Sequence, residues 1–257
     1  VRSRRQRQMC IRDRYNLLTV YPEFFESFKS HGLIKKGLDR GLISINVINL
    51  RNYTNDKHKR VDFKPFGGGP GMIIQYTPVK EALKKIKSSK TILLSPQGKL
   101  LKQSKLNELS AENSITFICG RYEGFDERIL DNLVDEEISI GDYVLSGGEI
   151  PAAVIIEGLT RLIPGIPENM ESINNDSFCD HLLDHPHYTK PSEIDGFSVP
   201  DILLSGNHSE IKLWRRKQSL GITYLKRPDL LKNVNLTEED DRLLQEFIAE
   251  YQEKKSD

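Results

Sequence analysis

The stretch SIGDYVLSGGEIP, from Ser139 to Pro151, contains the transition on which the fold depends. It begins as the end of a short apolar strand, passes through a Gly-Gly pair and ends on a proline suited to the first turn of a helix. A strand, a glycine loop and a helix in succession often cradle a phosphate group. This stretch has no lysine or arginine and carries two acidic side chains, so we expect the loop to hold a different kind of ligand.

Outward from this stretch, short apolar runs alternate with helix-like segments from residue 16 to about residue 163. The runs typical of strands buried on both faces of a sheet are NLLTV (16–20), LISINVINL (42–50), TILLS (91–95), ITFIC (115–119) and EISI (137–140). Helices are expected over 22–32, over 77–87 with Thr77 as the N-cap, and over 152–163. These repeated units predict an α/β domain with a mainly parallel sheet.

The sequence changes character after Pro164. A segment rich in Pro, Gly, Asn, Asp and Ser is followed by two helix candidates, 207–221 and 237–255, and the second has Thr237 as its cap and an apolar stripe. We therefore predict a small all-helical C-terminal domain. The expected organisation is a disordered or non-native basic extension (1–14), the α/β domain (15–166), a flexible linker (167–183) and the helical domain (184–257).

The formal net charge of zero hides an uneven distribution of charge over the 257 residues. Residues 1–14 carry six arginines and one aspartate, a net charge of +5, which leaves −5 for the rest of the chain. This basic segment has no helical or strand period and is predicted to be disordered; an RNA-binding arm and a non-native extension both remain open. Bulk charge therefore gives no argument for nucleic-acid binding.

The cysteines and the apolar runs bear on the compartment. The three cysteines, Cys10, Cys119 and Cys179, form no CxxC pair and are typical of reduced thiols, which predicts a cytoplasmic protein. No apolar run approaches the roughly 18 residues that a membrane span needs, and no secretory signal is visible. We expect no membrane association.

Three loops follow three of the expected strands: LSPQGK (94–99), CGRYEGFDER (119–128) and IGDYVLSGGEIP (140–151). Loops at the carboxyl ends of parallel strands are where α/β folds place ligands. None of the three matches a Walker loop or GxGxxG, and for any single loop the glycines could serve only tight turns. Together they predict a pocket in which backbone groups bind a flat uncharged ring such as adenine.

Six motifs closely resemble, in order and spacing, those of the bacterial tRNA (guanine-N1)-methyltransferases: LSPQGK, CGRYEGFDERI, SIGDYVLSGGEIPA, RLIPG, NDSF and PHYTKP. FKPFGGGPGM and LLSGNHSEIKLWRRKQSLG extend the resemblance over about residues 16–250. It implies a SPOUT-type α/β domain with a deep trefoil knot, which is a rare exception to the rule that chains do not knot. It also implies a homodimer with its active site at the subunit interface, S-adenosylmethionine as methyl donor, and tRNA methylated at N1 of the guanosine immediately 3′ of the anticodon.

Transferred motif by motif, the resemblance assigns the methyl donor to residues of the three loops. They are Leu94, Ser95 and Pro96; Gly120, Tyr122 and Glu123; and Ile140, Gly141, Tyr143, Leu145, Gly147, Gly148 and Pro151. A sulfonium donor is cationic and has no phosphate, so basic residues are unnecessary and a nearby acid is tolerated. For Ile140 and Leu145 alone, strand packing is the alternative interpretation.

The resemblance assigns catalysis to Asp176 in NDSF and Arg161 in TRLIPG. N1 of guanine is protonated at neutral pH, so a carboxylate must accept its proton while a cation offsets charge on O6. Asp176 is the expected general base, within a linker that could order when tRNA binds. Without the family, Asp176 would be an ordinary loop or N-cap aspartate and Arg161 a solvated charge near a helix end.

Two regions are expected to contact tRNA. The segment around Lys57–Arg60 precedes a triple glycine, and the resemblance places Asp62, Pro70 and Gly71 beside a flipped target base. The segment IKLWRRKQSLG carries Lys212, Arg215 and Arg216 beside Trp214, which suits the phosphates of an anticodon stem. A solvated loop and a charged helix face around a core tryptophan are the respective alternatives.

The segment HLLDHPHY places three histidines, His181, His185 and His187, at spacings that suggest a metal site. We expect none there, because Pro186 interrupts the geometry and no matching ligand cluster exists elsewhere in the sequence. The family implies a magnesium ion, for which the sequence gives no position.

Two other functions remain open. A related SPOUT enzyme that methylates ribosomal RNA at a ribose or a base is the first, but ribose methylation would not need the carboxylate in NDSF. A non-catalytic RNA-binding module or a GTP-binding protein is the second. The presence of Asp176 and Arg161 and the absence of GxxxxGK[ST] disfavour the RNA-binding module and the GTP-binding protein.

Overall fold

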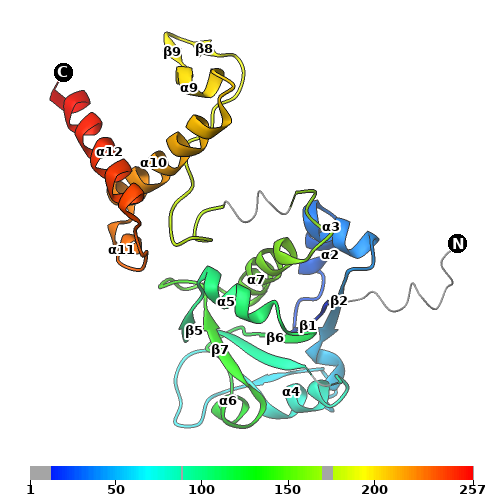
Figure 1. The fold of residues 1–257 in the computed structure, drawn as a ribbon. Helices are drawn as coiled ribbons and strands as arrows, with labels where there is room; N and C mark the ends of the chain where they lie inside the picture. Colours follow the sequence, from blue (N-terminus) through cyan, green and yellow to red (C-terminus); the bar gives the residue numbers. More distant parts are fainter. Residues whose placement is uncertain (1–12, 88, 170–175, 257) are drawn as a thin grey trace, which may run out of the picture. The chain divides into compact units, whose positions relative to one another are not determined.

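A computed structural model describes residues 13–87, 89–169 and 176–256 (Figure 1). The chain divides into two compact units, Val1–Glu168 and Asn169–Asp257. The extension predicted over residues 1–14 lies outside the described residues except for Asp13 and Arg14, which belong to the first strand. Within the described ranges, no helix combines the length and the apolar character that crossing a membrane would require.

The first unit is built on a five-stranded sheet in which every neighbouring pair is parallel. Its strands are β1 (Asp13–Thr19), β2 (Ile43–Asn49), β5 (Lys90–Leu100), β6 (Ser114–Cys119) and β7 (Glu136–Ser139). Their order in the sheet is β2-β1-β6-β5-β7. A separate antiparallel pair, β3 (Asp62–Phe63) and β4 (Ile73–Ile74), brackets the triple glycine. The predicted α/β class with a parallel sheet is confirmed.

Helices cover both faces of the sheet (Figure 1). They are α2 (Phe24–Lys29), α3 (Gly32–Asp39), the 3-10 helix η1 (Leu50–Tyr53), α4 (Tyr76–Leu83), α5 (Gln103–Leu109), α6 (Glu127–Leu133) and α7 (Glu149–Leu162). Leu17 packs in a core with α2, α3, α5 and α7, whereas the next residue, Leu18, packs in a core with α4 and α6. This alternation buries successive side chains on opposite faces, as expected for an internal parallel strand.

Two local predictions differ from the structure. Thr77 lies inside α4, because the helix begins one residue earlier, at Tyr76 after Gln75. Residues 94–99 are not a free loop, since β5 continues to Leu100 and both Leu94 and Lys99 lie opposite Ile138 of β7. Residues 95–98 therefore form an excursion within one strand. A Cβ on Gly98 would lie 2.5 Å from the Ile138 nitrogen, so the return to β7 requires glycine.

The second unit contains two long helices, α10 (His208–Lys226) and α12 (Glu238–Ser256). Its shorter elements are β8 (Glu193–Ile194), β9 (Phe197–Ser198), α9 (Asp201–Leu204) and α11 (Pro228–Leu231). The antiparallel pair β8–β9 was not foreseen in a domain expected to be all helical. Thr237 caps α12 as predicted, since its Oγ1 accepts a hydrogen bond from the Asp240 nitrogen at 3.1 Å.

The segment predicted as a flexible linker, 167–183, includes residues 170–175, which lie outside the described residues. Its last part is packed: Leu182 is buried together with Leu220, Leu243 and Leu244. The Leu183 nitrogen also donates to Thr223 Oγ1 at 2.9 Å. The packed structure of the second unit therefore begins before residue 184.

Candidate active site

The three loops line one cavity of about 460 Å³ in the first unit. All thirteen residues that the sequence assigned to a methyl donor contribute to its wall. They come from β5 with its excursion, the loop after β6, and the loop between β7 and α7 together with the first turn of α7. Because these strands are neighbours or next neighbours in a parallel sheet, their carboxyl ends bring the three loops to one edge.

The glycines of these loops allow close contact between the loops themselves. The Gly148 nitrogen donates to the Gly120 carbonyl at 3.0 Å, and a Cβ on Gly148 would lie 2.7 Å from the Cys119 Cα. A Cβ on Gly147 would lie 2.3 Å from the Arg121 Nε. The Gly-Gly pair is therefore required by packing of the third loop on the second, whatever the cavity holds.

The charged groups on the cavity wall are mostly acidic. Glu123, Glu127 and Glu137 line it together with one cation, Arg121. Arg121 Nη2 lies 3.0 Å from the Oε2 of Glu149, a carboxylate that is fully buried at the start of α7. The cavity therefore favours a cationic or neutral ligand over a phosphate.

Cys119, the last residue of β6, lies next to the cavity loops but is fully buried. Burial raises the pKa of its thiol well above the usual value, and the negative charge of Glu149 adds to this effect. The residue stays a neutral thiol and acts as a small core side chain.

The glycine-rich segment after β3 contacts the second cavity loop. The Glu123 nitrogen donates to the Met72 carbonyl at 3.0 Å, and a Cβ on Gly71 would lie 2.3 Å from the Glu123 Cγ. Gly71 and its neighbour Pro70 are exposed, and Asp62 is half-buried in β3. Gly71, expected beside the target base, therefore adjoins a residue of the cavity wall.

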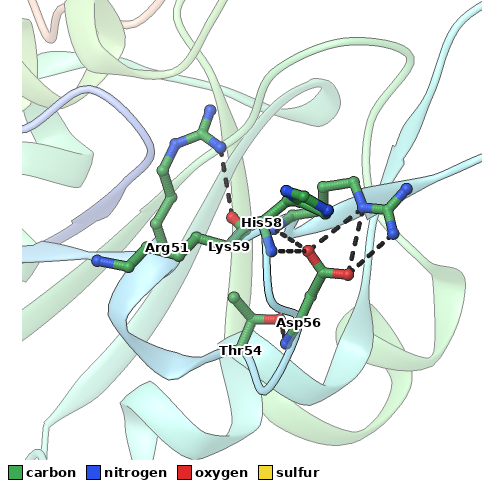
Figure 2. Close-up of polar contacts among 6 residues, drawn as sticks. Arg51, Thr54, Asp56, His58 and Lys59 are labelled. Carbon is green, nitrogen blue, oxygen red and sulfur yellow. Dashed lines mark hydrogen bonds and ion pairs between the residues drawn. The ribbon is translucent and has the colours of Figure 1, made fainter.

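The basic segment between η1 and β3 is organised around Asp56 (Figure 2). Its carboxylate accepts hydrogen bonds from the backbone nitrogens of His58 (2.8 Å) and Arg60 (3.1 Å), and from Arg60 Nη2 (2.9 Å). The hydrogen bonds from Arg60 hold the pKa of Asp56 far below its usual range. The Arg60 guanidinium is thus bound within its own loop, although Arg60 is exposed, as are Lys57, His58 and Lys59.

Arg161 lies in the last turn of α7, ten residues after the cavity residue Pro151. Since a helix rises 1.5 Å per residue, the two positions are about 15 Å apart along the helix axis. Arg161 is also not among the residues that line the cavity. Within one chain, the structure does not bring Arg161 to the residues assigned to the methyl donor.

Asp176 belongs to the second unit, in a tight turn formed by Asp176 and the residues that follow it. The Cys179 nitrogen donates to the Asp176 carbonyl at 3.2 Å, and the Phe178 nitrogen donates to the Leu182 carbonyl at 2.7 Å. Asp176 itself is half-buried. The residue expected to act as general base is therefore held on a hydrogen-bonded turn.

The cations predicted on α10 have different environments. Lys212 and Arg215 are exposed. Arg216 instead donates from Nε and Nη2 to both carboxylate oxygens of Asp240 on α12, at 2.7 and 2.9 Å. Arg215 lines a second cavity of about 1010 Å³ together with Trp214, Tyr188 and His187. Trp214 is only half-buried, so it is not the core side chain of the alternative interpretation.

Two of the three histidines lie close together, so Pro186 does not separate them as expected. The rings of His185 and His187 have centroids 4.3 Å apart, and their ligand atoms lie within 4.8 Å of one another and of an Asp184 oxygen. His187 Nε2 lies 2.9 Å from Asp184 Oδ2, a distance that a hydrogen bond accounts for. Burial opposes ionisation of Asp184, but the hydrogen bonds from His187 and from the His185 backbone outweigh it and lower its pKa.

Comparison with known proteins gives consistent results. A family model described as tRNA (Guanine-1)-methyltransferase TrmD matches residues 14–233. A protein named tRNA (guanine-N(1)-)-methyltransferase from Buchnera aphidicola subsp. Baizongia pistaciae is 50% identical over 237 residues, 90% of this chain and 95% of its own length. Proteins of the same name from Shewanella woodyi and Photobacterium profundum are each 48% identical, over 90% and 91% of this chain and 96% of their own lengths. The matched residues include all three cavity loops.

Proposed function

The chain belongs to the tRNA (guanine-1)-methyltransferase family, and on this basis we propose that it methylates N1 of the guanosine immediately 3′ of the anticodon in tRNA, with S-adenosylmethionine as methyl donor. The observation that carries the proposal is the convergence on one cavity of all thirteen residues assigned to the donor. When bound, the donor supplies a methyl group carried on a sulfonium cation.

The groups on the cavity wall fit this donor. Tyr122, Tyr143 and Leu145 offer apolar surface for an adenine, and the glycine loops expose backbone groups that can bind its edge. Glu123, Glu127 and Glu137 suit a cation, and the one guanidinium on the wall is already bound to Glu149. A ligand with a phosphate would meet three carboxylates without a compensating free cation on the described wall.

Asp176 and Arg161 have complementary roles in the proposed reaction. The Asp176 carboxylate accepts the N1 proton of guanine, which leaves the nitrogen able to act as a nucleophile. The Arg161 guanidinium offsets the negative charge that then builds on O6. Asp176 belongs to the second unit, and in the proposed reaction its carboxylate takes up its working position when tRNA binds.

We propose that the enzyme is a homodimer in which the cavity of one chain works with Arg161 of a second copy. The separation of about 15 Å between Pro151 and Arg161 along α7 supports this arrangement, because an arginine side chain cannot span it. In an active site at the subunit interface, Arg161 of the second copy would approach the cavity, so no side chain would have to span this distance.

The second unit is the proposed tRNA-binding part. Lys212 and Arg215 are available for phosphates on the exposed surface of α10, and Trp214 and Tyr188 provide aromatic surface beside them. Arg216 contributes by holding α10 to α12 through Asp240. In the first unit, Asp62, Pro70 and Gly71 are proposed to border the flipped base, and the contact between Gly71 and Glu123 supports this.

Three further features belong to the same proposal. A SPOUT-type trefoil knot is expected from the family, and the five-stranded parallel sheet is compatible with it. A magnesium requirement comes from the family and has no assigned residues. A cytoplasmic location rests on the sparse cysteines.

The experiment that tests the proposal compares two tRNA transcripts that differ only in having G or A directly after the anticodon. Labelled methyl groups from S-adenosylmethionine should enter the G transcript alone. Equal incorporation into both transcripts, or none into either, would overturn the proposal. Incorporation into ribosomal RNA instead would favour the related SPOUT enzyme.

A further inference from the structure

Three segments of the first unit meet at a buried carboxylate that the proposed chemistry does not use. Glu149, the first residue of α7, is fully buried, as is Thr19 at the end of β1. Thr19 Oγ1 donates to Glu149 Oε1 at 2.6 Å, and Arg121 Nη2 lies 3.0 Å from Glu149 Oε2. Arg121 and the residues directly before Glu149 line the cavity, whereas Thr19 and Glu149 do not.

The direction of each hydrogen bond in this network is fixed. Thr19 Oγ1 accepts from the Tyr21 nitrogen at 2.9 Å, so its single proton is free for Glu149. A bond as short as 2.6 Å is typical of a hydroxyl donating to an ionised carboxylate. Burying that charge is costly unless it is paired. The Arg121 guanidinium supplies the pairing as an ion pair at Oε2, an atom that accepts no hydrogen bond within the described residues.

Arg121 is held in turn by its surroundings. Its guanidinium lies over the Tyr21 ring at 4.6 Å, and Nη1 donates to the Ser146 carbonyl at 3.3 Å. Arg121 also forms an isolated antiparallel bridge with Gly147. Since a Cβ on Gly147 would lie 2.5 Å from Glu149 Oε2, the glycine leaves room for the ion pair to lie directly against the backbone.

We infer that Glu149 is a positioning residue for the methyl donor, which rests on the function proposed above. β1 is an internal strand of the sheet, and Glu149 joins its end to both the second and the third cavity loops. The network thus sets the distance between the two loop walls that the ligand must fit. Glu149 itself touches neither donor nor tRNA, and Thr19 acts through it.

The experiment uses two Thr→Val variants that each remove one fully buried hydroxyl. Thr19→Val breaks the network. Thr116→Val is the matched control, because Thr116 on β6 is equally buried and hydrogen-bonded to Asn16 and Ser89, outside the network. Glu149→Gln keeps the shape of the side chain and removes its charge. Binding of S-adenosylmethionine is measured by calorimetry on the full chain, followed by KM, kcat and the unfolding midpoint.

Thr19→Val and Glu149→Gln should each raise the Kd and KM for S-adenosylmethionine about tenfold, with a smaller change in kcat. The double variant should bind no more weakly than Glu149→Gln alone, since both changes act on one network. Thr116→Val should bind as the wild type does, even where its unfolding midpoint falls as far as that of Thr19→Val.

Two results would overturn the inference in distinguishable ways. If wild type binds the donor and both network variants bind it within about twofold of wild type, or if Thr116→Val weakens binding equally, Glu149 has no positioning role. If wild type itself does not bind S-adenosylmethionine, the proposed function fails, and the inference fails with it.

Discussion

Asp176 is the residue whose assigned role departs most from what its surroundings alone indicate. It occupies a half-buried position in a turn, where aspartate is common for reasons of local hydrogen bonding. If Asp176 is the general base, removing its carboxylate should slow methyl transfer without weakening binding of the methyl donor. The turn carries no residue of the cavity wall, so loss of the carboxylate should leave that wall intact.

Asp176→Ala should reduce kcat by about 10²-fold or more while the Kd for S-adenosylmethionine stays close to that of wild type. Single-turnover methyl transfer and calorimetry on the same preparation measure the two quantities. Asp180→Ala, four residues later in the same turn, is the control and should retain activity. Lost donor binding in Asp176→Ala would mean that the residue shapes the cavity and is not the base.

The sequence did not predict the ion pair between Arg121 and Glu149 beside the cavity. Arg121 and Glu149 both stand in the quoted motifs, yet nothing in their spacing indicates that a glutamate at a helix start is fully buried. Burial of Glu149 depends on Thr19, which is 130 positions away in the chain. Such a partner can be identified only after the order of the strands is known.

At the scale of elements, the strands and long helices were predictable because their apolar periods are strong. The runs 42–50, 115–119 and 137–140 match strands of the sheet to within one residue at each end, and the run 16–20 begins three residues after the start of β1. The excursion within β5 was not predictable, because LSPQGK has the composition of a turn and its return to Ile138 depends on β7. The β8–β9 pair was not predictable either, because two-residue strands have no detectable period.

The contact between α10 and α12 gives a test at this scale. Hydrogen bonds from Arg216 lower the pKa of Asp240 despite its burial. Asp240→Asn should therefore lower the free energy of unfolding by about 2 kcal/mol at pH 7. Asp241→Asn, at the next and exposed position, is the matched control and should have little effect.

The effect of Asp240→Asn should depend on pH in one direction. Because the folded-state pKa of Asp240 is depressed, its contribution is complete above the unfolded-state pKa of about 3.9. It is lost as the pH falls through the folded-state value. Denaturant unfolding of wild type and variant at pH 7 and pH 3 should show the difference shrinking at the lower pH. An equal difference at both values would mean that the ion pair does not stabilise the helix contact.

For the whole molecule, the position of Arg161 on α7 leads to a complementation test. Leu145→Arg places a cation in the donor cavity, and Arg161→Ala removes the cation assigned to O6; each homodimer should be inactive. If one active site combines the cavity of one chain with Arg161 of another, mixed dimers contain one intact site. Co-expression with two affinity tags isolates these dimers, which should regain methyl transfer. Mixed dimers as inactive as both parents would place Arg161 and the cavity in the same chain.

Methylation of guanine at N1 in tRNA is the proposed activity of this molecule. The most direct measurement incubates the full chain with S-adenosylmethionine and a tRNA transcript bearing G after the anticodon, digests the product to nucleosides and identifies the methylated one by mass spectrometry. We predict 1-methylguanosine, located at that single position by a primer-extension stop, and none from the transcript bearing A. A methyl group on ribose, on another base or at another position would rule out this activity.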